Sequence, residues 1–144
     1  MIDNAYAVVD FENGARGMLD LCMFAEGSYW QELLTVTGDR ARVEVRVPGP
    51  SRFSADGHER QAEICISDRD SLRERTETVD VDETILRAGD HHGSTYFQHQ
   101  RFFDLVRSGN GEPELSLLDG LWSVIVGEAA EESARTGRAV EVGL

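Results

Sequence analysis

The strongest constraint on the fold is the pair Asn13-Gly14, which lies between two runs of strand-forming residues, YAVVDF and ARGMLDLCMF. Asn-Gly tolerates positive φ and is typical of a two-residue type I′ hairpin turn. With Glu12 facing Ala15, Val9 is expected opposite Met18. One face then carries Val9, Phe11, Met18 and Cys22, and the other carries Tyr6, Val8, Leu19 and Leu21. Because both faces are apolar, we expect partners on both sides of this sheet.

Further strands are expected between residues 30 and 81. The runs ELLTVT and ARVEVRV are joined through Gly38 and Asp39. In ARVEVRV, Ala41 and three valines alternate with charged residues, which predicts a strand with one solvated face. Shorter alternating runs at 62–66 and 76–81 predict outer strands separated by charged turns.

Two helices follow these strands. Ser94 or Thr95 is placed to cap the first helix, whose apolar stripe ends at Gly109. Ser116 and Asp119 form the capping-box pattern of the second helix, which we expect to end at Gly137. The run RAVEV at 138–142 predicts a closing strand. This order predicts the α+β class, with a mostly antiparallel open sheet, two C-terminal helices packed on one face, and the other face available for dimerisation.

The composition favours one soluble domain over residues 1–144, because this length suffices for a single hydrophobic core. The 27 acidic residues outnumber the 14 basic ones, which disfavours nucleic acid or an anionic membrane as a partner. The opening residues lack signal-peptide features, and no stretch approaches the roughly 20 apolar residues of a membrane helix, so we expect a cytoplasmic protein. Cys22 and Cys65 each lie in an alternating apolar run, which predicts two buried thiols.

The sequence contains no lysine, so all 14 basic residues are arginines. This absence excludes Schiff-base chemistry, a Walker-type phosphate lysine and a lysine general acid within this chain. The common motifs G-x-G-x-x-G, G-x-S-x-G and H-E-x-x-H are also missing. The usual sequence signatures of catalysis are therefore absent.

Three of the four histidines lie in one segment, DHHGSTYFQHQ. His91 and His92 point to opposite faces if the chain is extended, and no Cys or His pair has zinc spacing, so no metal site is predicted. His99 falls on the apolar stripe of the first helix and is expected to be a core histidine. His91 and His92 precede a helix N-terminus, where a loop role and a substrate-contact role both stay open.

Other charged side chains are interpreted as solvated. Glu128 and Glu132 share a helix face, as an acid and base pair would, but like charges one turn apart are more typical of an exposed surface. Arg101 and Arg107 flank the first helix, and surface arginines on an acidic protein need no anionic ligand.

Four segments together resemble a known family. They are DNAYAVVDFENGARGMLDL, ELLTVTGDRARVEVRVPG, HHGSTYFQHQRFFDLVRSG and LSLLDGLWSVIVGEAAEESARTGRAVEV. In this order they resemble the C-terminal domain of the Gfo/Idh/MocA oxidoreductase family, the glucose-fructose oxidoreductase and inositol dehydrogenase group, over nearly the whole chain. The resemblance implies a mostly antiparallel sheet with helices on one face, which normally follows a Rossmann domain that binds NAD or NADP. In such enzymes the open sheet face commonly forms the subunit contact.

The residues that carry catalysis in that family have no counterpart here. Its glycine-rich fingerprint and its Glu-Lys-Pro motif do not occur in the sequence, so no catalytic, cofactor-binding or metal residue is assigned. The HHG segment resembles a family loop near the substrate pocket of some members. This makes His91 and His92 the candidate substrate-binding residues.

The resemblance implies that the chain is the substrate-side and oligomerisation domain of an NAD(P)-dependent sugar or polyol oxidoreductase, not catalytic by itself and separated from its Rossmann domain as a fragment. The chain would bind no cofactor, and the complete enzyme would use NAD or NADP. Its partners would be a second copy, the Rossmann domain and a sugar or polyol. The alternative is a free-standing binding domain that self-associates or pairs with a separate oxidoreductase subunit. A third possibility is an enzyme in which His91 or His92 works with Asp90.

Overall fold

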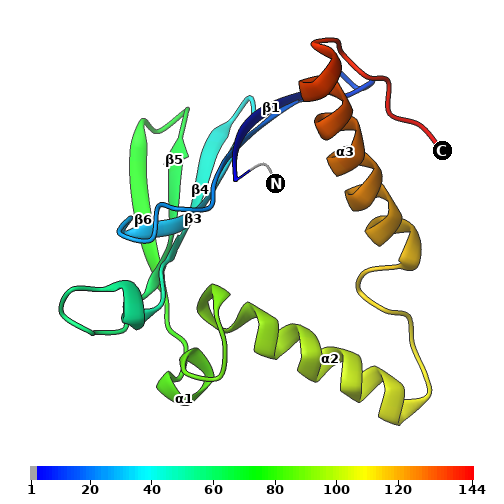
Figure 1. Cartoon of the computed structure of the whole chain (residues 1–144). Coiled ribbons are helices and arrows are strands. Elements are labelled where there is room, and N and C mark those ends of the chain that lie inside the picture. Colours follow the sequence, from blue (N-terminus) through cyan, green and yellow to red (C-terminus); the bar gives the residue numbers. More distant parts are fainter. Residues whose placement is uncertain (1–2) are drawn as a thin grey trace. The chain divides into compact units, whose positions relative to one another are not determined.

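The computed structural model describes residues 3–144, which form β-strands followed by helices (Figure 1). The described residues divide into two compact units, one of residues 3–21 with 104–144 and one of residues 22–103. The expected α+β class, with antiparallel sheets and helices toward the C-terminus, is confirmed. None of the helices in the described part of the chain is long and apolar enough to cross a bilayer.

The first unit begins with the expected hairpin, β1 (Asn4–Asp10) and β2 (Arg16–Cys22). Its turn differs from the prediction by one residue. The Phe11 N–H donates to the Ala15 carbonyl at 3.0 Å, and the Gly14 N–H donates to the Phe11 carbonyl at 2.9 Å. Gly14 has φ +85° and ends a three-residue loop, the second common hairpin connection. The predicted pairing of Glu12 with Ala15 is therefore wrong.

This one-residue change moves side chains between the faces of the hairpin. Carried along the strands, the pairing of Phe11 with Ala15 sets Val8, rather than Val9, opposite Met18. An ion pair between Arg16 Nε and Asp10 Oδ1 at 3.7 Å fits this register. One face then holds Tyr6, Val8, Met18 and Cys22, and the other holds Val9, Phe11, Leu19 and Leu21.

The first unit closes with helix α3 (Leu117–Thr136). Its predicted boundaries are confirmed, because Ser116 and Asp119 form a reciprocal capping box and Gly137 adopts the left-handed conformation at the C-cap. The predicted strand at 138–142 is not formed. A strand is held by hydrogen bonds to a neighbouring strand, and no described strand pairs with these residues.

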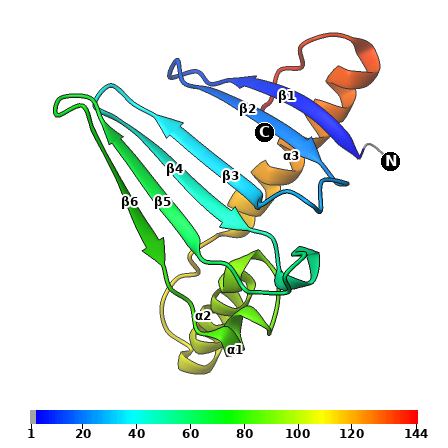
Figure 2. The same cartoon turned by 90° about the vertical axis from the view of Figure 1, so that its left-hand side faces the viewer.

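The second unit is built on a four-stranded antiparallel sheet, seen from its broad side in Figure 2. Its strands are β3 (Trp30–Thr37), β4 (Ala41–Pro48), β5 (Ala62–Asp68) and β6 (Arg73–Val79), in that spatial order. The expected turn near Gly38 is confirmed, since the Gly38 N–H donates to the Ala41 carbonyl at 2.9 Å. Consecutive strands thus pair with their neighbours throughout.

The two faces of this sheet have different chemistry, which follows from its register and from the alternation of side chains. One face, the apolar face, carries Leu34, Val36, Val43, Val45, Val47, Ile64 and Ile66, with charged residues at its margins, including Glu32 on β3 and Arg75 and Glu77 on β6. The opposite face, the polar face, carries Arg42, Glu44, Arg46, Glu63, Cys65, Ser67 and Thr76. The predicted alternation of ARVEVRV between an apolar and a charged side is thus confirmed in β4.

Ion pairs connect the long side chains of the polar face. The Glu44 carboxylate lies 2.7 Å from a guanidinium nitrogen of Arg42 and 2.8 Å from one of Arg46. Another guanidinium nitrogen of Arg46 lies 3.4 Å from the Glu63 carboxylate. Beside them Cys65, which pairs with Glu44 across the strands, is only 2% exposed. The prediction of a buried thiol is confirmed for Cys65 and wrong for Cys22, which is exposed on β2.

Two 3₁₀ turns and two α-helices lie in the segments that follow β4 and β6. They are the 3₁₀ turn η1 (Ser51–Phe53), helix α1 (Glu83–Leu86), the 3₁₀ turn η2 (His91–Gly93) and helix α2 (Ser94–Ser108). The sequence predicted α2 but neither α1 nor the 3₁₀ turns. Asp82 caps α1 by accepting from the Thr84 N–H at 2.8 Å, and Leu86 is buried.

Candidate functional site: the histidine turn

The candidate site is the turn Asp90-His91-His92-Gly93, which joins α1 to α2 (Figure 1). Its last three residues have φ values of 58°, 52° and 81°. For a histidine this left-handed conformation costs on the order of 1 kcal/mol or more, so neighbouring contacts must hold it. A Cβ on Gly93 would lie 2.9 Å from Ile85 Cγ2, and glycine is therefore required at this position.

Asp90 anchors the start of the turn through a two-pronged ion pair. Arg52 on η1 donates to both carboxylate oxygens, with N–O distances of 2.6 and 2.7 Å. This planar geometry is the strongest that arginine offers to a carboxylate. The hydrogen bonds from Arg52 lower the pKa of Asp90 below its ordinary value, so the carboxylate stays ionised and the clamp stays closed near neutral pH.

His91 pairs with a carboxylate on a distant strand. Its Nδ1 atom is hydrogen-bonded to Oε1 of Glu32 on β3, and the two side chains are about half exposed, at 51% and 47%. No sequence pattern indicated Glu32, because it is one of many acidic residues and lies 59 positions from His91. Only the tertiary structure joins the two.

His92 has a different environment, at the end of the β5–β6 ladder. Its Nε2 atom lies 3.3 Å from the Ala62 N–H and 3.3 Å from the Val79 carbonyl oxygen. These two backbone groups belong to paired residues of the sheet. His92 thus ties the turn to the sheet, whereas His91 faces Glu32, and the two histidines do not converge.

The other candidate residues of the sequence do not join this turn. His99 is exposed on α2, with its ring 6.4 Å from that of Phe103, so the predicted core histidine is wrong. Glu132 lies 3.7 Å from Arg135 on α3, and Glu128 is also exposed, as a solvated helix face requires. Within residues 3–144, no group of three or more His, Cys, Asp or Glu side chains could hold a metal ion.

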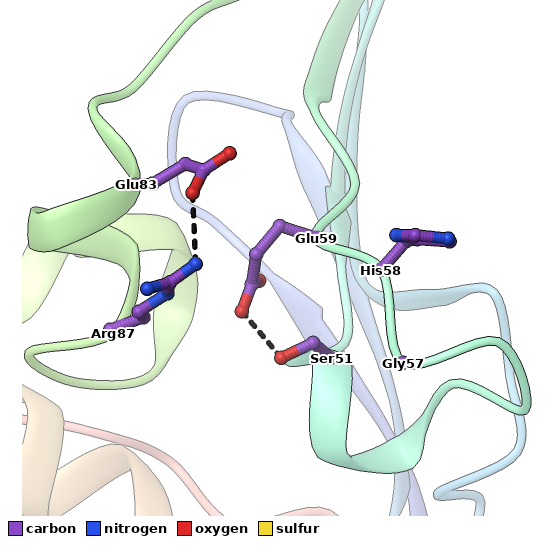
Figure 3. A pocket seen from close by; sticks show the side chains of 6 residues that line it. All are labelled: Ser51, Gly57, His58, Glu59, Glu83 and Arg87. Atoms are coloured by element: carbon purple, nitrogen blue, oxygen red, sulfur yellow. Dashed lines mark hydrogen bonds and ion pairs between the residues drawn. The ribbon is translucent and has the colours of Figure 1, made fainter.

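An open polar cavity of about 380 Å³ lies near the turn (Figure 3). Its side chains satisfy one another in pairs, with Arg87 2.9 Å from Glu83 and Ser51 hydrogen-bonded to Glu59. His58 points away from these four residues in Figure 3. A crevice directly beside His91 and His92 measures only about 10 Å³, room for at most one water molecule. Any ligand of the turn must therefore bind on its outer surface.

An antiparallel sheet followed by helices, with a polar turn at the end of the sheet, defines the class of protein as an α+β domain. The family model described as "Oxidoreductase family, C-terminal alpha/beta domain" matches residues 2–142. The chain therefore belongs to the Gfo/Idh/MocA oxidoreductase family and carries its C-terminal α/β domain. A comparison with curated proteins found no match.

Proposed function

We propose that the chain is the substrate-side and oligomerisation domain of an NAD(P)-dependent oxidoreductase that acts on a sugar or polyol. The family match over residues 2–142 is the observation that carries this proposal. The strained histidine turn supports it, because residues held in sparsely populated backbone conformations cluster at functional sites. Half-exposed polar groups at the turn suit a substrate rich in hydroxyl groups.

Within this proposal the two histidines have separate tasks. His91, whose side chain is half exposed, contacts the substrate. His92, whose ring meets the end of the β5–β6 ladder, holds the turn in place. Substitution of His91 should then weaken substrate binding, and substitution of His92 should first weaken the fold.

The residues present do not fit a nicotinamide cofactor. Dinucleotide binding uses a glycine-rich turn between a strand and a helix N-terminus, and no G-x-G-x-x-G stands in the sequence. The proposal therefore assigns the nicotinamide to a Rossmann domain and no hydride-transfer step to this chain. Titration of the isolated chain with NADH should show no micromolar binding, and a saturable micromolar isotherm would contradict the assignment.

Self-association is proposed through the apolar face of the four-stranded sheet. Leu34 and Val36 on this face are 62% and 59% exposed. Neighbouring apolar side chains left this open favour an interface with a second copy. The family resemblance points to a sheet face in the same role.

Steady-state kinetics of the native polypeptide from its source cells test the proposal. With a panel of sugars and polyols, His91→Ala should raise KM for the preferred substrate about tenfold or more and leave KM for the nicotinamide unchanged. His99→Ala, an exposed histidine outside the turn, is the matched control. An unchanged KM for every substrate would contradict the role of His91. A native polypeptide the size of this chain alone would favour a free-standing binding domain instead.

A further inference from the structure

The pairing of His91 with Glu32 determines where the imidazole carries its proton. An ionised carboxylate has no hydrogen to donate, so the nitrogen that faces it must be the donor. In this structure that nitrogen is Nδ1. We infer that Glu32 holds His91 in the Nδ1–H tautomer and thereby presents Nε2 as a hydrogen-bond acceptor for a hydroxyl group of a neutral ligand. The ligand part of this inference rests on the proposed function.

The Nε2 atom of His91 is available for such a bond. It has no hydrogen-bond partner among residues 3–144, and about half of the side chain is exposed. His92 differs in this respect, because its Nε2 either accepts from the Ala62 N–H or, when protonated, donates to the Val79 carbonyl. The Nε2 atom of His92 is therefore engaged by the sheet in either tautomer, whereas the Nε2 atom of His91 can bind a ligand without breaking an existing contact.

Three sets of contacts fix the orientation of the His91 ring. Arg52 holds Asp90 immediately before His91, and the contacts of His92 hold the chain immediately after it. Glu32 then fixes the ring itself. The tautomer of a histidine is set by the hydrogen bond that its other nitrogen makes. Glu32 is thus a positioning residue, which acts on the ligand through His91.

The charges around the ring restrict the ligand class. Glu32 and Asp90 both carry carboxylates, and the charge of Arg52 is matched by Asp90. An ionised phosphate or carboxylate group has no hydrogen to donate to Nε2 and would add a negative charge beside Glu32, which disfavours its approach. A neutral hydroxyl can instead donate to Nε2. The geometry therefore favours a neutral sugar or polyol over a sugar acid or a sugar phosphate.

Long-range ¹H–¹⁵N NMR of the histidine rings in the full chain tests the tautomer, since it reports which nitrogen is protonated. At mildly alkaline pH, where imidazoles are neutral, His91 should show a protonated Nδ1 and an unprotonated Nε2. Glu32→Ala should abolish this preference, and Glu32→Gln, whose amide oxygen can still accept from Nδ1, should restore it. His58 and His99 serve as internal controls and should not change. An Nε2–H or doubly protonated His91, or a pattern unchanged by Glu32→Ala, would overturn the inference.

Adding myo-inositol as a neutral probe and gluconate as an anionic probe to the native polypeptide tests the ligand class. The His91 Nε2 signal should move with myo-inositol, move about tenfold less with gluconate, and stay still for both in Glu32→Ala. Equal responses, or none with myo-inositol, overturn the role as a hydroxyl acceptor. If the tautomer is wrong while His91→Ala still raises KM, only this inference fails. If the tautomer is right but neither KM nor the Nε2 signal responds, the proposed substrate role fails.

Discussion

The two faces of the four-stranded sheet differ in how their side chains are shielded from water. On the polar face, the long side chains of Arg42, Glu44 and Arg46 pair with one another beside Cys65, which is almost completely buried. On the apolar face, Val43, Val45 and Ile64 of the inner strands are half-buried, whereas Leu34 and Val36 on the edge strand β3 stay largely exposed, as does Leu33 on the opposite face. The charged side chains of the polar face thus cover one another, whereas the apolar side chains of the edge strand are left open to a partner.

The largest difference between the faces should appear on introducing a charge into each. Val45 pairs with Leu34 on one side and Ile64 on the other, so Val45→Asp places a carboxylate among apolar side chains. We expect it to reduce the free energy of unfolding by about 3 kcal/mol. The matched control, Glu44→Gln, changes the adjacent residue of the same strand on the opposite face and should cost much less. Equal losses in urea denaturation would contradict the contrast.

The second comparison concerns self-association. Val36 and Thr35 are neighbours on β3 and point to opposite faces, so Val36→Asp and Thr35→Asp introduce the same charge on each face. We expect Val36→Asp to weaken dimerisation at least tenfold, since desolvating the carboxylate at an interface is costly, while Thr35→Asp stays dimeric. Light scattering measures the mass, and circular dichroism confirms that both variants are folded. A dimeric Val36→Asp protein would remove the apolar face from the interface.

The third comparison uses the two thiols as reporters. Cys22 is exposed and should react at once with a disulfide reagent, whereas Cys65 should react only after local opening of the sheet. Removing the neighbouring Glu44 side chain in Glu44→Ala should speed labelling of Cys65 by about tenfold. Val36→Ala, which acts on the other face, should leave that rate unchanged. A Cys65 that labels as fast as Cys22 would show that the ion pairs do not protect it.

The smallest expected effect is a pH dependence of the polar face. The hydrogen bond from Arg46 lowers the pKa of Glu44 from its ordinary value of 4.5. A lowered pKa stabilises the fold above pH 4.5, and this contribution is lost as pH falls below that value and through the folded-state pKa. The difference in Tm between wild type and Glu44→Gln should therefore shrink in acid. The difference between wild type and Val45→Ala should stay constant, since neither residue titrates.

Local patterns in the sequence predicted the elements better than their partners. The alternation of ARVEVRV predicted both faces of β4, and the capping box at Ser116 predicted where α3 begins, because both signals lie within a few residues. The hairpin near Gly14 was predicted with a register one residue wrong. Asn-Gly permits a two-residue turn, and it equally permits the glycine to end a three-residue loop.

Sequence patterns predicted the histidines of the candidate site but not the residues that pair with them. The pair of histidines before a helix was visible in the sequence, but nothing indicated that Glu32 would meet His91 or that Arg52 would meet Asp90. Those pairings depend on how β3, η1 and η2 are brought together by the sheet. The prediction of a strand at 138–142 was wrong for the same reason, since a strand forms only where a neighbouring strand hydrogen-bonds to it.

The sheet ends in two unlike margins. β6 closes one side with all of its residues exposed and with arginine and glutamate along most of its length, a composition that repels an additional strand. β3 closes the other side with Leu33, Leu34 and Val36, and its single charged residue is Glu32. An additional strand can therefore hydrogen-bond to the sheet at β3 but is disfavoured at β6. Pairing along the edge, which is distinct from the apolar face proposed for self-association, can add one further sheet at β3 and then meets charged β6 margins, so it cannot continue into a fibre.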